Sequence, residues 1–262
     1  MSPDLTSDIT DDGALGGRLQ LLQPRKGHRF GHDAILLAAA TPARAGEHAV
    51  DLGAGVGAAG LALAKRVDGV AITLVEIDAA LCALARDNAA RNGMADRVRI
   101  AALDVTAAES FFDEANLKSG CTDRVLMNPP FHDAATAQAS PNAARRVAHV
   151  AQAGSLAVWV DAAARLLRPE GTLSMIYRAD ARNEVIAALA DKFVSVDVLP
   201  VYPKPGASAI RIILQAVRGE CVRNEKAVVN TSAGLVLNGL DGRPAAEAEA
   251  ILRNAAALPV KG

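Results

Sequence analysis

The twelve residues from Ala49 to Gly60 constrain the fold more than any other part of this 262-residue chain. The run Ala49–Leu52 is apolar apart from Asp51, which predicts a short buried strand. The glycines that follow are Gly53, Gly55 and Gly57. They cannot all lie inside a helix, because glycine costs about 1 kcal/mol there relative to alanine. They predict instead a tight turn between a strand and a helix, where the backbone approaches a ligand closely.

A second apolar run, Ala71–Val75, ends at Glu76 and predicts the next strand. In open α/β sheets, ligands bind at the carboxyl edge of the parallel strands, and an acidic residue there typically holds the hydroxyls of a ribose. The segment Leu61–Arg66 between the two strands is helical in character. Together these segments predict a parallel α/β crossover that binds a nucleoside.

Two kinds of cofactor compete for this crossover. Gly55, Gly57 and Gly60, with Glu76 after them, match the fingerprint of dinucleotide-binding proteins. Asp51 favours another ligand, because its carboxylate repels a pyrophosphate and attracts a cation. S-adenosylmethionine (AdoMet) carries a sulfonium, an ammonium group and a ribose, and it has no phosphate. AdoMet is therefore the favoured cofactor, and the alternatives are a dinucleotide or a glycine turn without a ligand.

Polar residues also follow the third and fourth predicted strands. Asp104 follows Arg97–Leu103, where it can accept a hydrogen bond from the amino group of an adenine, or cap the next helix. Asn128 follows the strand that begins at Arg124, and the prolines after it hold it extended. Its amide oxygen and a nearby carbonyl can accept both hydrogens of a planar amine, which leaves the nitrogen lone pair free to attack a methyl group. Phe131 offers a ring on which a base can stack; the alternative is an ordinary Pro-Pro turn with Phe131 in the core.

The segment Gln23–Phe30 is rich in cationic side chains, with two arginines, a lysine and a histidine in eight residues. One interpretation is a solvated turn. The other is a patch that contacts phosphates beside the active site.

These motifs resemble a known family. The stretch Asp51–Gly57 resembles motif I of class I AdoMet-dependent methyltransferases, and Asn128–Phe131 resembles motif IV of enzymes that methylate exocyclic amino groups of nucleic-acid bases. With Gln23–Ala38, they resemble the bacterial tRNA(Val) adenine-N6-methyltransferase family, which modifies the adenine beside the anticodon. The resemblance extends from about Gly16 to Leu214.

The resemblance implies a Rossmann-like class I methyltransferase fold, α/β, with a mostly parallel seven-stranded sheet, helices on both faces and an antiparallel last strand. It implies AdoMet as cofactor, S-adenosylhomocysteine as product and RNA, favouring tRNA, as partner. The implied cofactor-binding residues are Asp51, Gly53, Gly55, Glu76, Ile77, Asp104, Val105 and Asn128. The implied catalytic residues are Asn128, Pro129 and Phe131. The candidate substrate-binding residues are Arg25, Lys26, Arg29, Phe131 and His132.

Other acceptors fit the same motif. With His132, the sequence Asn-Pro-Pro-Phe-His also resembles ribosomal RNA guanine-N2-methyltransferases. A protein glutamine side chain or a small molecule presents a comparable planar group, and a non-catalytic AdoMet-binding RNA module is an alternative from another class.

Composition limits the partners. With 28 basic and 29 acidic residues, binding of nucleic acid requires a local patch. Cys82, Cys121 and Cys221 lack a C-x-x-C spacing, which predicts a reducing cytosol and no zinc site. No apolar run is long enough for a membrane span, so we expect a cytoplasmic protein that is a monomer or a homodimer. We expect a flexible tail over residues 1–15, the methyltransferase domain with a small N-terminal extension over 16–219, and a C-terminal extension packed on it over 220–262.

Overall fold

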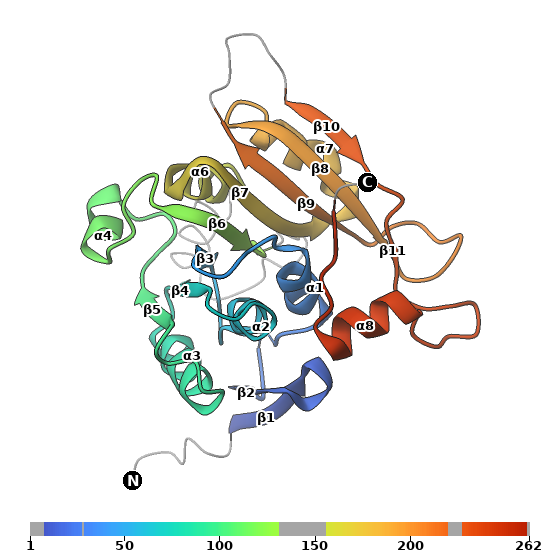
Figure 1. The fold of residues 1–262 in the computed structure, drawn as a ribbon, viewed down its shortest axis with the longest axis horizontal. Helices are drawn as coiled ribbons and strands as arrows, with labels where there is room; N and C mark the ends of the chain where they lie inside the picture. Colours follow the sequence, from blue (N-terminus) through green and yellow to red (C-terminus); the bar gives the residue numbers. More distant parts are fainter. Residues whose placement is uncertain (1–7, 28, 131–155, 220–226, 261–262) are drawn as a thin grey trace, which may run out of the picture.

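A twisted α/β sheet with helices on both faces forms the centre of the molecule (Figure 1). The computed structural model describes residues 8–27, 29–130, 156–219 and 227–260. The strands of the sheet are β3 (His48–Leu52), β4 (Ala71–Glu76), β5 (Val98–Ala102), β6 (Thr122–Met127), β7 (Leu167–Arg178), β8 (Phe193–Tyr202), β9 (Arg211–Arg218), β10 (Val228–Thr231) and β11 (Leu235–Val236). In the described ranges they follow the order β10-β8-β9-β7-β6-β3-β4-β5, and β11 also pairs with β8.

Strands β3 to β7 run parallel to one another, whereas β9 runs antiparallel to both β7 and β8. Parallel strands covered by helices on both faces are buried on both sides, which explains why nearly every residue of β3 and β6 is buried. In β4, Ile72 and Leu74 belong to one hydrophobic core while Val75 belongs to the other. The sheet therefore separates two cores.

Each core is covered by its own helices. The first contains residues of α1 (His32–Ala40), α2 (Ala58–Arg66) and α3 (Ala79–Arg91). The second contains residues of α4 (Glu109–Glu114), α6 (Leu156–Leu166) and α7 (Arg182–Leu189). None of the helices within the described ranges is long and apolar enough to cross a membrane.

The two ends of the described chain meet on the face of the sheet that carries the first core. Strands β1 (Ile9–Ala14) and β2 (Leu19–Pro24) form an antiparallel hairpin, closed by the 3-10 turn η2 (Leu15–Gly17), and β2 lies against α3. Helix α8 (Ala246–Asn254) contacts η2 and α1 (Figure 1). The guanidinium of Arg18 donates to the carbonyl of Arg253 at 2.7 Å, which joins the hairpin to α8.

The expected seven strands are present with the antiparallel β9, and β10 and β11 extend the sheet beyond them. The period-two alternation of Val194–Leu199 is typical of an edge or half-exposed strand, but β10 pairs with Ser195–Val198 and makes β8 an inner strand. Strand β10 has only four residues, all exposed, so its sequence carries no signature of burial.

Candidate active site

Four neighbouring parallel strands end at one edge of the sheet, and most of the expected site residues follow these ends. Leu52 at the end of β3 pairs with Val75 of β4 and with Met127 of β6. Glu76 at the end of β4 pairs with Ala102 of β5. The glycine turn, Ile77, Asp104 and Asn128 therefore leave the sheet at the same edge, as the sequence predicted.

The glycine turn is fixed at its start and open at its middle. Gly53 has φ +70°, and a Cβ there would lie 2.5 Å from the Trp159 ring of α6, so packing as well as backbone conformation requires glycine. Gly55 has φ +58°, and apart from Gly55 and its two chain neighbours no atom of the described structure lies within 4 Å of where its Cβ would be. A ligand can therefore reach the backbone of this turn at Gly55.

Glu76 is held by the backbone through both carboxylate oxygens. Oε2 accepts the Gly55 N–H at 2.8 Å, and Oε1 accepts the Asp78 N–H at 2.9 Å. A carboxylate has about four acceptor sites, so each oxygen can still accept a hydroxyl. Ile77, the next residue, has 63% of its surface exposed and offers an apolar contact beside this carboxylate. A preorganised carboxylate next to exposed apolar surface suits a ribose carrying a flat base.

Asp51 is turned toward helix α2. Only 3% of it is exposed, and Oδ2 accepts the Gly60 N–H at 2.9 Å. Burial raises the pKa of Asp51 to about 7; the Gly60 N–H opposes this shift and the charge of Glu76 adds to it. The observed role of Asp51 is therefore to join β3 to the first turn of α2, and its direct contact with a cofactor stays a prediction.

Asp104 and Val105 contribute differently to this edge. Oδ1 of Asp104 accepts both the backbone N–H and the hydroxyl of Thr106 at 2.8 Å. The N-cap of α4 is Ala108, so Asp104 forms a local turn and does not cap that helix. The side chain of Val105 is buried in the second core, which leaves its backbone as the part that can face a ligand.

Asn128 presents a buried acceptor at the end of β6. Its Oδ1 is buried and, within the described residues, has no hydrogen-bond donor. An unpaired buried polar atom costs about 1–3 kcal/mol, so this oxygen marks a place where a donor from a ligand fits. Pro129 is buried and Pro130 is exposed. Phe131 and His132, which the sequence assigned to the acceptor, lie outside the described residues.

The basic segment before α1 has a partly structural role. The guanidinium of Arg29 donates to Asp12 at 2.8 Å, to the Thr10 hydroxyl at 2.9 Å and to the carbonyl of Pro24. Hydrogen bonds from Thr10 and Gln23, and then Arg29, hold the pKa of Asp12 below its usual value. Arg29 therefore clamps the hairpin, whereas Arg25 and Lys26 are exposed just after β2.

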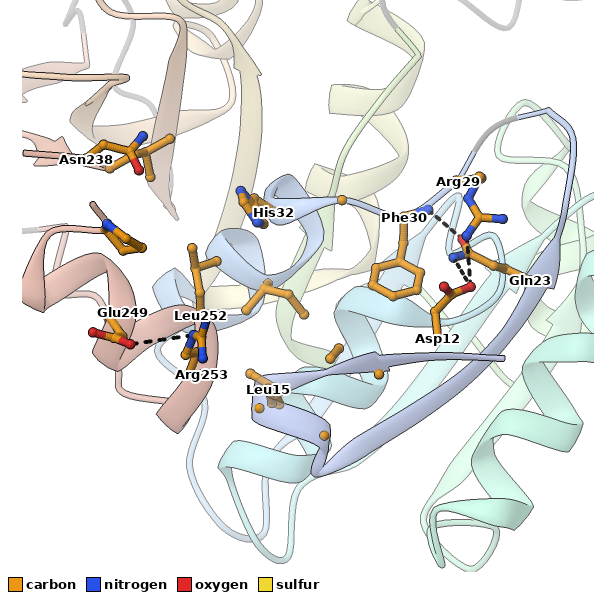
Figure 2. A pocket seen from close by; sticks show the side chains of 18 residues that line it. Asp12, Leu15, Gln23, Arg29, Phe30, His32, Asn238, Glu249, Leu252 and Arg253 are labelled. Atoms are coloured by element: carbon orange, nitrogen blue, oxygen red, sulfur yellow. Dashed lines mark hydrogen bonds and ion pairs between the residues drawn. The ribbon is translucent and has the colours of Figure 1, made fainter. Parts of the chain in front are cut away.

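A groove of about 570 Å³ lies between the hairpin, the start of α1, α8 and the segment Leu237–Pro244 (Figure 2). The Arg29–Asp12 pair lies toward one end and the Arg253–Glu249 pair toward the other (Figure 2). None of Asp51, Glu76 and Asn128 lines this groove, so it is separate from the edge of the sheet described above. The described residues contain no cluster of three His, Cys, Asp or Glu side chains that could hold a metal ion.

Sequence reasoning missed Asn88 of α3, which is completely buried and contacts the glycine turn. The signal was present. The sequence predicts a helix over Ala79–Asn92 with Leu81, Leu84 and Ala85 on one face, and Asn88, seven residues after Leu81 and four after Leu84, lies on that face. An asparagine at that position is a buried polar group, and such groups have specific partners.

Comparison with known proteins places the chain in a family. The family model described as methyltransferase small domain matches residues 30–202. The tRNA1(Val) (adenine(37)-N6)-methyltransferase of Dickeya chrysanthemi (strain Ech1591) is 28% identical over 229 residues, which cover 86% of this chain and 87% of that relative. Release factor glutamine methyltransferase of Chlorobaculum tepidum is 33% identical over 164 residues, 59% of this chain and 53% of that relative. The crystal structure of a predicted O-methyltransferase from Agrobacterium tumefaciens has a TM-score of 0.71 at 25% identity and covers 87% of this chain and 98% of that one.

These similarities confirm the predicted class of enzyme and its fold. The matched range contains the glycine turn, Glu76 and Asn128, and therefore all four strand ends that form the site. The chain belongs to the methyltransferase small domain family and is a methyltransferase of the class I fold.

Proposed function

We propose that this protein transfers a methyl group from AdoMet to N6 of an adenine in tRNA. The observation that carries the proposal is the buried Oδ1 of Asn128, which lacks a donor among the described residues and follows the strand next to the glycine turn. The relative from D. chrysanthemi, which this chain matches over most of its length, is named for this reaction at adenine 37 of tRNA1(Val).

The residues at the edge of the sheet fit AdoMet. Glu76 has both oxygens held by backbone N–H groups and suits a ribose diol, and Ile77 offers apolar surface for the adenine ring. The open backbone at Gly55 admits the methionine part. A pyrophosphate fits less well, because Asp51 and Glu76 place two carboxyl groups beside the turn. When bound, AdoMet supplies a methyl group already activated by its sulfonium.

The protein contributes position more than proton transfer. Oδ1 of Asn128 accepts one hydrogen of the exocyclic amine, and the carbonyl of Pro129 accepts the other. With both hydrogens held, the nitrogen lone pair would be free to take the methyl group that bound AdoMet would supply, with S-adenosylhomocysteine as the leaving group. The nitrogen then releases one proton to solvent. Correct placement of two reactants can lower a barrier by about 7–11 kcal/mol, which makes alignment the main contribution of the site.

A protein glutamine is the second candidate acceptor, because the release factor glutamine methyltransferase of C. tepidum is 33% identical over 59% of this chain. Asn128 holds a glutamine amide as well as it holds an adenine amine. RNA is favoured because the tRNA enzyme matches 86% of the chain, and because the exposed Arg25 and Lys26 can contact phosphates. An alcohol acceptor fits less well, since it has only one hydrogen to offer the two carbonyl groups.

Methyl transfer to tRNA tests the proposal. Purified protein is incubated with methyl-labelled AdoMet and total tRNA from a strain that lacks this gene, and the digested nucleosides are separated. We expect label in N6-methyladenosine, and much less label when the tRNA comes from a strain that carries the gene, because its sites are already methylated. Label in N2-methylguanosine would contradict the adenine assignment. Label in release factor protein, with none in tRNA, would contradict RNA as the acceptor.

A further inference from the structure

Asn88 connects two parts of the molecule that are far apart in sequence. Its side-chain Nδ2 donates to the carbonyl of Leu22 in β2 at 2.9 Å and to the carbonyl of Val56 in the glycine turn at 3.0 Å. Its Oδ1 accepts the Leu22 N–H at 2.7 Å. These partners fix the orientation of the amide, because a backbone N–H must face the oxygen and two carbonyls must face the nitrogen. Asn88 has no exposed surface, so water cannot replace these bonds.

Asn92, one helical turn later, makes the same pair of hydrogen bonds to β2. Its Oδ1 accepts the Gln20 N–H at 3.0 Å and its Nδ2 donates to the Gln20 carbonyl at 2.7 Å. Four residues on a helix advance about 6 Å, close to the advance of two residues on a strand, so the two asparagines cover alternate residues along the edge of β2. Asn88 also donates to the glycine turn, whereas the third hydrogen bond of Asn92 goes to the Asn88 carbonyl within the same helix at 2.7 Å.

The bond to Val56 completes the anchoring of the turn. The N–H groups of Gly53 and Ala54 donate to the carbonyl of Val75, and the Gly55 N–H donates to Glu76. Val56 lies between Gly55 and Gly57, both with positive φ, so its peptide groups have unusual freedom to rotate. The hydrogen bond from Asn88 restrains the Val56 carbonyl.

We propose that Asn88 is a positioning residue that holds the glycine turn in its cofactor-binding conformation and couples it to the β1–β2 hairpin. The inference rests on the proposed function in that AdoMet is the cofactor of this turn. Asn88 itself touches no reacting atom. Its effect is on the affinity for the cofactor, and the hairpin that Arg29 clamps and that precedes Lys26 is held against the same side chain.

The pair Asn88→Ala and Asn92→Ala separates this role from general stabilisation of the hairpin. Each variant removes two hydrogen bonds to β2, but only Asn88→Ala removes the bond to Val56. We expect Asn88→Ala to weaken AdoMet binding by about tenfold in calorimetry. The loss of one buried hydrogen bond changes an equilibrium constant by about this factor. The KM of this variant for AdoMet should rise by the same factor, while its kcat at saturating AdoMet stays within about twofold of the wild-type value. Asn92→Ala should bind AdoMet as the wild type does.

Equal AdoMet affinity in the two variants, whether unchanged or reduced, would overturn the proposal. If Asn88→Ala does not fold, a measurement on the wild type still tests the proposal. The wild type alone also tests the coupling: AdoMet should slow hydrogen exchange at the Leu22 amide more than at the Gln20 amide, and an equal effect at both would contradict it. A wild type that binds no AdoMet would refute the proposed cofactor instead.

Discussion

At the scale of single residues, the site uses two buried carboxyl groups in different ways. Glu76 accepts two backbone N–H groups, which fix the orientation of its carboxylate. Asp51 accepts the Gly60 N–H in an environment buried enough to raise its pKa to about 7. Both residues could be predicted from sequence as acids at strand ends. The direction of Asp51 toward α2 could not, because it depends on Gly60, where any Cβ would lie 2.4 Å from Leu74.

The raised pKa of Asp51 predicts a pH-dependent stability. The folded state binds the proton of the Asp51 carboxyl group more tightly than the unfolded state does. The contribution of Asp51 to the free energy of unfolding is therefore present below about pH 4 and is lost as the pH rises to about 7. Each pKa unit corresponds to about 1.4 kcal/mol, so relative to Asp51→Asn the wild type should lose up to about 4 kcal/mol of unfolding free energy over this range.

Urea unfolding of the wild type and of Asp51→Asn at pH 4.5, 6 and 7.5 checks this result. Asp96→Asn removes an exposed carboxylate and controls for the loss of one charge. Parallel stability curves for the wild type and Asp51→Asn across these pH values would show that the folded protein does not retain the Asp51 proton.

At the scale of elements, the opposite edge of the sheet is held by a buried ion pair. Arg124, near the start of β6, binds Glu47 through two hydrogen bonds of 2.6 and 3.0 Å and donates to the Thr172 hydroxyl of β7. The two charged side chains are only 10% and 15% exposed. Sequence patterns predicted the strands but not this pair, because its members are 77 residues apart and meet only when β3 and β6 align.

Arg124→Ala should lower the unfolding free energy by about 3–5 kcal/mol, because it leaves the Glu47 charge buried without its partner. The AdoMet affinity of the folded variant should stay within about twofold of the wild type, since the pair lies at the edge of the sheet away from the glycine turn. Denaturant unfolding and calorimetry measure the two effects.

Arg168→Ala is the matched control. Arg168 pairs with Asp123 on a neighbouring part of the same edge, but its side chain is 42% exposed. Such a pair contributes about 0–1 kcal/mol, so this variant should be nearly as stable as the wild type. Equal destabilisation by the two substitutions would mean that burial of the Arg124 pair has no special effect.

At the scale of the whole molecule, the parts that could be predicted are those with local signals. The first βαβ crossover shows its strand, turn and acid within 28 residues, and its geometry follows from chain direction alone. The additions could not be predicted in the same way. Strand β11 has two residues, and Leu258 near the end of the chain donates its N–H to the carbonyl of Ala39 in α1 at 2.9 Å. Such contacts depend on tertiary packing rather than on a periodic pattern.

We propose that Asn128 aligns the methyl acceptor at the edge of the sheet where the glycine turn and Glu76 hold the cofactor. Comparison of Asn128→Ala with the wild type tests it most directly, by single-turnover methyl transfer to tRNA and AdoMet binding on the same preparations. Asn254→Ala, which changes an exposed asparagine of α8, is the control. We expect turnover to fall by about 100-fold or more, because alignment is lost, while the AdoMet Kd changes by less than about threefold. Turnover near the wild-type rate, or a loss of AdoMet affinity as large as the loss of turnover, would contradict the claim.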